Sequence, residues 1–246
     1  MVNLVHHSAA VDFETLYIKL REKEGRLYSD DQVARLPDIS NTHVHSNEWI
    51  IRKESSQKLV RWLKKKKKAV DILEIGCGNG WLAHQLATIP SSMVIGTDIN
   101  FFEIQQAARV FQNNSNLHFI YTSGNPDVFK ENRFDVVIFA ASIQYFESFP
   151  DIIQTTLTWL RNDGEIHILD SPFYSEMELL AAKQRSRDYY KSNGFPGMAD
   201  YYFHHSFDDL KKFNCRIMYQ PGKLMTRLTG NKNPFPWIVI RQGVNV

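Results

Sequence analysis

The sequence contains few cysteines and no long apolar run. Its two cysteines, Cys77 and Cys215, could form at most one disulfide, which excludes a small disulfide-stabilised scaffold. The longest wholly apolar run, Val136–Ala141, has six residues, whereas a transmembrane helix needs about 18. The first residues lack a basic start followed by an apolar stretch, so no secretory signal is indicated. We therefore expect a cytoplasmic protein with no membrane partner.

An excess of positive charge is also missing. Lys and Arg total 29 against 27 Asp and Glu, which leaves a formal net charge of +2. A protein that neutralises many phosphates normally carries a clearer basic excess, so we do not expect a nucleic-acid partner. The lysine run Lys64–Lys68 follows a predicted helix, where cations favour the carbonyl end of the helix dipole, and a solvated helix end explains it better than a nucleic-acid site.

Strand and helix patterns alternate from residue 69 onward. Such alternation predicts a parallel sheet with helical crossovers, and two closing strands separated by a short connection predict an antiparallel pair at its edge. We expect an α/β, Rossmann-like, doubly wound sheet of seven strands, mostly parallel with an antiparallel last strand, and helices on both faces. The predicted strands are 69–75, 93–97, 117–121, 134–141, 165–170, 215–220 and 237–241, and the predicted helices are 13–21, 49–63, 80–89, 101–111, 152–161 and 173–193.

The first of these strands ends in a glycine-rich turn, Gly76-Cys77-Gly78-Asn79-Gly80. Glycines between a buried strand and a helix allow a sharp turn and a close approach of the backbone to a ligand. A nicotinamide-binding turn would place glycine or alanine at the sixth position, where this chain has the bulky Trp81. Asp98 ends the next predicted strand, and an acid there suits the two hydroxyls of an adenosine ribose.

With these residues the chain resembles the class I S-adenosylmethionine-dependent methyltransferases. The resemblance rests on Glu74–Gly80, on Asp98, on Phe134–Val137 at the start of the fourth strand and on Leu160–Glu165 before the fifth. It implies S-adenosylmethionine as the methyl donor and S-adenosylhomocysteine as the product. The donor-binding residues that it implies are Glu74, Gly76, Cys77, Gly78, Gly80, Asp98, Ile99 and Ala140.

The loop after the third strand departs from the family pattern. Members usually carry an acid there, against the adenine amino group, whereas this chain reads Tyr121-Thr122-Ser123-Gly124-Asn125. Either Ser123 or Asn125 would take that place, with Gly124 in the same turn. The resemblance leaves this choice open.

Segments outside the motifs are expected to enclose the site. Residues 1–68 read as an N-terminal helical cap and residues 69–246 as the methyltransferase domain, with an aromatic lid inserted at about 171–214. In many family members such an addition covers the donor. Tyr28 and Arg52 are therefore predicted donor contacts, Arg52 because a guanidinium suits the donor's carboxylate. Surface or packing roles for both remain the alternative.

The sequence displays no fixed catalytic constellation, and methyl transfer needs none, because the reaction consists mainly in aligning acceptor and methyl group. A general base is required only for an acceptor that is protonated at the working pH. The candidates for such a base or an orienting group are His43, His45, Tyr145, Asp170 and His204, each of which could instead serve in packing or capping. The histidine pairs lack a third clustered ligand, so we predict no metal site.

These observations predict an enzyme that methylates a small-molecule acceptor. After the fourth strand the chain reads Ser142-Ile143-Gln144-Tyr145. The Asp/Asn-Pro-Pro-aromatic tetrapeptide that nucleic-acid amino methyltransferases carry there is absent. An RNA or protein methyltransferase and a non-catalytic donor-binding module remain the alternatives, and a nicotinamide oxidoreductase is a more distant one. Monomer and homodimer are both open.

Overall fold

The computed structural model describes residues 8–66, 68–122, 129–222 and 233–243, and its centre is a seven-stranded sheet. The strand order is β3-β2-β1-β4-β5-β9-β8. This architecture confirms the predicted α/β, Rossmann-like fold. The strands are β1 (Val70–Ile75), β2 (Ser92–Asp98), β3 (Leu117–Tyr121), β4 (Phe134–Ala140), β5 (Leu160–Leu169), β8 (Asn214–Tyr219) and β9 (Trp237–Arg241).

The direction of the strands follows the prediction. β3, β2, β1, β4 and β5 are parallel to one another, and β9 runs antiparallel to both of its neighbours, β5 and β8. The last strand in sequence therefore lies inside the sheet, and β8 forms the edge. β4 lies in the middle of the sheet and is buried from Phe134 to Phe139, as expected for a strand covered on both faces.

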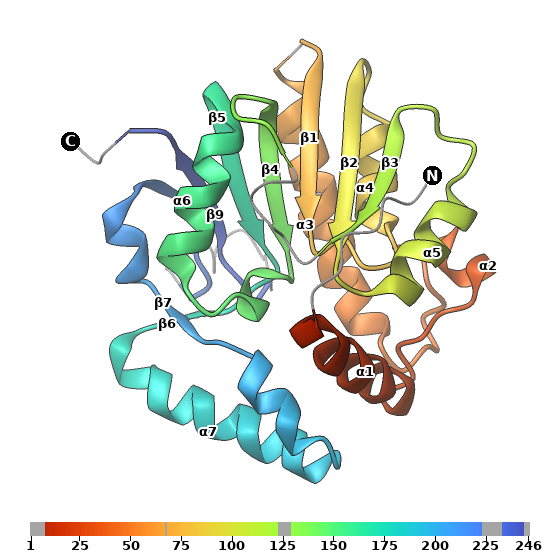
Figure 1. Ribbon diagram of the computed structural model, residues 1–246, viewed down its shortest axis with the longest axis vertical. Coiled ribbons are helices and arrows are strands. Elements are labelled where there is room, and N and C mark those ends of the chain that lie inside the picture. The colour runs from red at the N-terminus through yellow and green to blue at the C-terminus, as the bar shows by residue number, and fades with distance from the viewer. Residues whose placement is uncertain (1–7, 67, 123–128, 223–232, 244–246) are drawn as a thin grey trace.

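Apolar side chains alternate between the two faces of the sheet. Ile72 and Val136 belong to a core beneath α3 (Ser46–Lys64), α4 (Trp81–Ala87) and α5 (Phe101–Val110), whereas Leu73 and Val137 belong to a core beneath α6 (Phe149–Trp159). The twofold period of a strand produces this separation. Figure 1 shows the helices on the two sides of the sheet.

Residues 162–164, which precede the predicted fifth strand, lie within β5. The pairing with β4 passes from Phe134↔Leu160 to Val136↔Glu165, so residues 161–164 form an irregular excursion, and regular pairing resumes where the strand was predicted to begin. The Arg161 guanidinium donates to carboxylates of Asp71 (2.6 Å) and Asp135 (2.5 Å), which fixes the excursion against the neighbouring strands.

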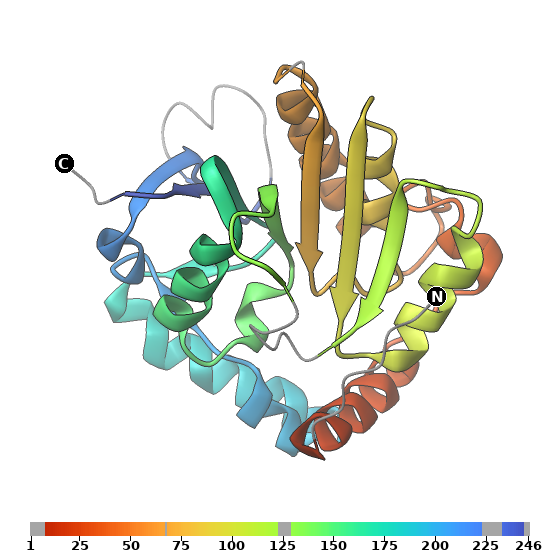
Figure 2. The ribbon, with the colours of Figure 1, turned by 45° about the horizontal axis from the view of Figure 1, so that its top comes forward.

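A third apolar cluster joins the N-terminal segment to the region after β5. α1 (Ser8–Lys23) contributes Phe13 and Leu20, α7 (Glu176–Ser192) contributes Tyr190, and the 3-10 helix η3 (Pro196–Tyr201) contributes Met198. Two polar contacts fasten the same elements, Lys23 Nζ to Asn193 O at 2.7 Å and the Tyr189 hydroxyl to the Glu24 carboxylate. Figure 2 shows α1 and α7 meeting below the carboxyl ends of the strands. The short elements α2 (Asp30–Val33), η2 (Ile143–Tyr145), β6 (Phe173–Tyr174), β7 (His205–Ser206) and η4 (Asp209–Lys212) complete the described chain.

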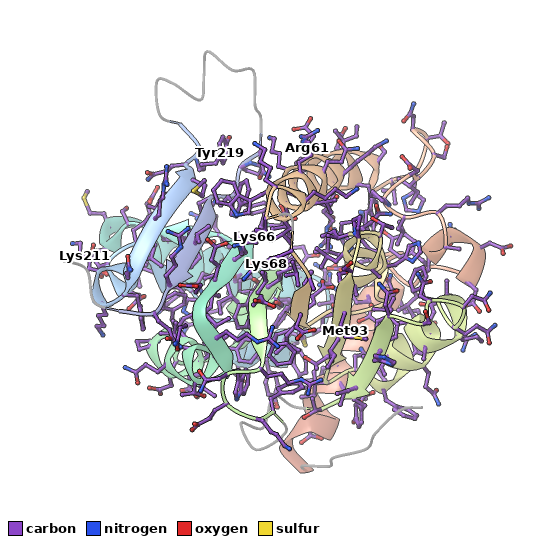
Figure 3. The ribbon with its side chains drawn as sticks, turned by 90° about the horizontal axis from the view of Figure 1, so that it is seen from above. Arg61, Lys66, Lys68, Met93, Lys211 and Tyr219 are labelled. Carbon is purple, nitrogen blue, oxygen red and sulfur yellow. The ribbon has the colours of Figure 1, made fainter. Side chains whose placement is uncertain are left out.

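Lys66 and Lys68 of the lysine run lie at the opposite side of the sheet, by the amino ends of the strands (Figure 3). Lys66 Nζ lies 2.8 Å from the Glu165 carboxylate and Lys68 Nζ lies 3.3 Å from that of Asp135. Two lysines of the run are therefore paired with strand acids. None of the helices in the described parts of the chain is long and apolar enough to cross a membrane.

Candidate active site

A cavity of about 500 Å³ lies between the carboxyl ends of β1, β2 and β4 and helix α1, which Figure 2 shows below those strand ends. In open α/β sheets ligands bind at this end, where the strand order reverses, and the volume is typical of small-molecule sites. The glycine turn, the ends of β1, β2 and β4 and the first turn of α5 form one part of its wall, and α1, α3, η2 and η3 form much of the rest.

The three glycines of the turn all have positive φ, +74° at Gly76, +52° at Gly78 and +76° at Gly80. A Cβ at Gly76 would lie 2.4 Å from the Cβ of Ser142, and one at Gly80 would lie 2.6 Å from the Phe119 ring. Gly76 and Gly78 line the cavity, whereas Gly80 allows α5 and β3 to pack closely behind it. The turn thus presents bare backbone to a ligand.

Two buried acids stand beside this turn. Asp98 accepts hydrogen bonds from the amides of Gly78 and Asn100, both at 2.8 Å. Burial raises the pKa of Asp98 to about 6, against those bonds. Glu103, in the first turn of α5, has its pKa raised to about 7 by burial and by the nearby Asp98. Both side chains line the cavity, so they place oxygens there that can accept hydrogen bonds. Their negative charge varies with pH near neutrality.

Glu74 is the most deeply buried acid of the wall, at 2% exposure, and its Oε2 has no hydrogen-bond partner. Burial raises the pKa of Glu74 well above its usual range. Two further polar atoms of the wall, Asn100 Nδ2 and Thr122 Oγ1, are also buried without partners. Buried polar groups normally have partners, so these atoms indicate a polar ligand.

Arginines occupy another part of the wall. Arg26 and Arg52 both contact the Glu48 carboxylate, at 2.5 and 2.9 Å, and the Arg52 guanidinium lies 5.3 Å from the centroid of the Trp49 ring. Trp49 Nε1 in turn donates to the Tyr28 hydroxyl at 2.8 Å. A guanidinium held in this way suits a carboxylate ligand.

Aromatic rings close the cavity on the side of α1. The Phe13 ring lies 5.6 Å from the rings of Tyr17 and Tyr145 and 5.3 Å from that of Tyr201. Arg21 stands among them, with its guanidinium 4.6 Å from the Tyr17 centroid and Nη2 donating to the Tyr145 hydroxyl at 3.1 Å. This end of the cavity is apolar except for one cation and the phenol hydroxyls.

The structure brings most of the predicted donor-binding residues together. Gly80 does not line the cavity and packs behind the turn instead. Ser123, Gly124 and Asn125 lie outside the described residues. The predicted residues that line the cavity are Tyr28, Arg52, Glu74, Gly76, Cys77, Gly78, Asp98, Ile99 and Ala140.

Of the five predicted catalytic candidates, Tyr145 lines the cavity. His45 Nε2 instead contacts the Glu24 carbonyl oxygen at 2.7 Å, and the His43 ring packs on Tyr28 at 5.7 Å. His204 Nε2 lies 2.9 Å from the Ser186 hydroxyl.

Asp170 lies beside a separate cavity of about 20 Å³, where its carboxylate oxygens are 2.8 Å from the Ser55 hydroxyl. Within the described chain, no group of three or more His, Cys, Asp and Glu could hold a metal ion.

Several lining residues were not predicted, among them Phe13, Tyr17, Arg21, Arg26, Glu48 and Glu103. A sequence signal existed for three of them. Phe13, Tyr17 and Arg21 are spaced by four, which places them on one face of a helix, and all three face the cavity. No local motif marks the others.

Comparison with known proteins identifies the fold and its relatives. A family model described as a methyltransferase domain matches residues 66–228. Malonyl-[acyl-carrier protein] O-methyltransferase of Halalkalibacterium halodurans is 22% identical over 147 residues, which are 56% of this chain and 54% of that protein. The chain thus spans about half the length of this curated relative.

Two solved structures have the same fold at low sequence identity. Magnesium protoporphyrin IX methyltransferase from Synechocystis PCC 6803, with bound S-adenosylhomocysteine, superposes with a TM-score of 0.59 at 16% identity and covers 94% of this chain and 100% of its own. A plantazolicin methyltransferase superposes with a TM-score of 0.56 at 16% identity and covers 97% and 100%.

Proposed function

Because the chain belongs to the class I S-adenosylmethionine-dependent methyltransferases, we propose that it transfers the donor's methyl group to a small-molecule acceptor held in this cavity and releases S-adenosylhomocysteine. The predicted family, and with it the enzyme class and the methyl donor, is confirmed. The acceptor class and the roles of individual residues are the proposal.

One observation carries it, which is that a single cavity has two chemically different ends. Buried acids and bare glycine backbone line the end at β1 and β2, and aromatic rings line the end beneath α1. A polar adenosyl donor matches the first end. An organic acceptor with an apolar body matches the second.

The residues present fit the donor. Asp98 would accept from the ribose hydroxyls, Glu74 with its unpartnered Oε2 would receive a polar group of the donor, and Arg52 would bind the donor's carboxylate. Ile99 and Ala140 supply apolar wall. When bound, the donor supplies an electrophilic methyl group on a positively charged sulfur.

The chain's own contribution is alignment and the exclusion of water. We assign the cap, residues 1–68, and the lid, about 171–214, to the enclosure of the acceptor. Phe13, Tyr17 and Tyr201 from these segments line the cavity. The in-line approach of the acceptor is then set by this aromatic wall and by Tyr145 after β4.

A small-molecule acceptor is preferred over a nucleic acid. The cavity is walled by α1 and η3, the net charge is +2, and Ser142–Tyr145 does not match the base-holding tetrapeptide. The relatives are named for malonyl-[acyl-carrier protein], magnesium protoporphyrin IX and plantazolicin. A cytoplasmic location belongs to the same proposal.

Turnover tests the proposal directly. Purified protein is incubated with S-adenosylmethionine and a panel of small acids, amines and phenols, and S-adenosylhomocysteine is quantified. We expect its formation to depend on at least one acceptor. Tight donor binding with no turnover on any acceptor would favour the non-catalytic module, and turnover on RNA or protein alone would favour the other alternative.

A further inference from the structure

We propose that the acceptor presents a carboxylate, that Arg21 binds this carboxylate, and that the product is a methyl ester. The inference rests on the proposed function, methyl transfer within this cavity. It follows from the position of Arg21, from the balance of charge around it and from the kinds of side chain that line the cavity.

Arg21 is placed at the acceptor end of the cavity. It projects from α1 among Phe13, Tyr17 and Tyr145, and its Nη2 donates to the Tyr145 hydroxyl at 3.1 Å. Tyr145 follows β4, so this contact ties Arg21 to the strand end at which the sheet order reverses. Any acceptor that approaches the donor from the aromatic side therefore passes this guanidinium.

The charge of Arg21 is only partly compensated. Its Nη1 donates to the Glu24 carboxylate at 2.8 Å, but Glu24 also lies 3.1 Å from Arg26 Nε. Arg26 shares Glu48 with Arg52 in turn. Three guanidinium groups thus share two carboxylates along this wall, so Arg21 has no carboxylate to itself, and the Tyr145 hydroxyl brings no charge.

The acids of the donor end are matched by the donor itself. Asp98 and Glu103 line that end, and the donor brings an ammonium and a charged sulfur, which these acids would face. A cationic acceptor would then meet Arg21 on one side and a positive sulfur on the other, whereas an anion is attracted by both.

The acceptor end of the cavity also lacks a base that could remove a proton from the acceptor. No histidine or lysine is among the described residues that line the cavity, and the carboxylates of Asp98 and Glu103 line its other end, at β1 and β2. Tyr17 is a buried phenol whose pKa burial raises, so it stays neutral and can only donate or accept a hydrogen bond. A phenol, alcohol or ammonium acceptor must lose a proton, but a carboxylate is already ionised at neutral pH and needs no base.

The transfer balances without a proton. A carboxylate oxygen lone pair forms the new O–C bond to the methyl group while the C–S bond breaks. The electron pair of that bond goes to sulfur and neutralises its charge. The negative charge of the acceptor disappears at the same time, so the ester product loses its attraction to Arg21 and is released more readily than the acid.

The nature of the product tests the proposal. The wild-type chain is given methyl-labelled S-adenosylmethionine with octanoate, phenylacetate or malonyl-coenzyme A, and in parallel with octylamine, phenethylamine or 4-ethylphenol. We expect label only with the carboxylates, in a form that mild alkali releases as volatile methanol. Alkali-stable label from an amine or phenol would overturn the proposal.

Binding of the carboxylate tests the role of Arg21 whether or not a panel member turns over. Each carboxylate is titrated calorimetrically into the protein saturated with S-adenosylhomocysteine. Arg21→Gln should weaken binding by roughly 10- to 100-fold, as expected for losing a charge-assisted hydrogen bond. The affinity of Arg21→Lys, which keeps the charge and loses the planar guanidinium, should lie between those of the wild type and Arg21→Gln. Arg35→Gln removes an exposed arginine outside the cavity and should change nothing.

Different outcomes would contradict the role of Arg21 and the proposed function. If the wild-type and Arg21 variants bind S-adenosylhomocysteine equally but no carboxylate binds, or carboxylates bind equally to both, the inference is wrong and the proposed function stands. If the wild-type chain does not bind S-adenosylhomocysteine, the proposed function itself fails.

Discussion

Asp98 and Glu103 show how burial prepares single side chains for a charged ligand. Both carboxylates line the cavity at the end where we propose that the donor binds, and burial raises both pKa values, to about 6 and about 7. In the ligand-free protein, burial therefore favours the protonated form of each acid more than the unfolded chain does. Their contribution to stability is therefore present below the ordinary values of 3.8 and 4.5 and is lost as the pH rises through 6 and 7.

Donor affinity should consequently depend on pH. Ribose hydroxyls and positive charge need the ionised carboxylates, so the affinity for S-adenosylmethionine should rise as the pH increases from about 5.5 to 7.5. The change should be roughly tenfold per pH unit for each proton released. Calorimetry in buffers with different ionisation enthalpies measures the protons. Glu103→Gln should remove the part of this dependence near pH 7, and a pH-independent affinity in the wild type would contradict the assignment.

Gly76 gives a prediction about close approach. Gly76→Ala places a Cβ 2.4 Å from that of Ser142, whereas Gly222→Ala, at a similar φ of +80°, meets nothing within 4 Å. Both should lose roughly 1–2 kcal/mol to the left-handed backbone. Gly76→Ala should lose clearly more, together with donor affinity, as followed by urea unfolding and titration with S-adenosylhomocysteine. Equal losses in the two variants would show that the contact with Ser142 is unimportant.

At this scale the sequence predicted the residues that lie close together in the chain. Gly76, Gly78 and Asp98 belong to one strand–turn–helix–strand unit, so their spacing alone predicts that they lie at the same end of the sheet. Arg21 and Glu48 reach the cavity through tertiary packing of α1 and α3, which no local pattern specifies. Asp170 was a candidate because it ends β5, but a positive φ and the Ser55 contact hold it at another cavity.

At the scale of elements, the enclosure depends on α1 docking against α7 and η3. Leu20, Tyr190 and Met198 are buried in this cluster, which is separate from both sheet cores. Most of the surface of α7 is exposed, so few buried contacts hold the enclosure. Regions of this kind open locally at lower free energy than the sheet.

Met198→Ala should loosen the enclosure selectively. Truncating a fully buried methionine costs about 2–5 kcal/mol. We expect faster amide hydrogen exchange in α1 and α7, with β1 and β4 unchanged. Met177→Ala, which truncates a methionine of α7 with 94% exposure, is the matched control and should leave all four elements unaffected. Uniform acceleration across the sheet would mean that the cap and the sheet open as one unit.

Helix and strand positions were largely predictable, whereas their docking was not. Apolar periodicity predicted helices at 13–21 and 49–63, which the structure extends to Ser8–Lys23 and Ser46–Lys64. α6 begins at Phe149, earlier than predicted, because the Ser148 side chain caps it and Pro150 suits its first turn. Ion pairs to Asp71 on β1 and Asp135 on β4 hold the excursion at 161–164 against the sheet, and no local pattern in the sequence specifies these partners.

At the scale of the whole molecule, the donor should stabilise the fold. A ligand that binds only the folded state at 100 times its dissociation constant adds about 2.7 kcal/mol, which for a chain of this size corresponds to roughly 5–10 °C in Tm. S-adenosylhomocysteine should produce such a shift. NAD should not, because Trp81 occupies the position where a dinucleotide turn needs a small residue. A shift with NAD alone would restore the oxidoreductase hypothesis.

The most direct measurement is a calorimetric titration of S-adenosylhomocysteine into the wild type, Asp98→Ala and Asp163→Ala. Asp98 lines the cavity, and Asp163 is an exposed acid outside it. We predict one site per chain in the wild type, a loss of at least ~1.5 kcal/mol of binding free energy in Asp98→Ala, and no change in Asp163→Ala. Equal affinity of all three proteins would contradict the location of the donor site.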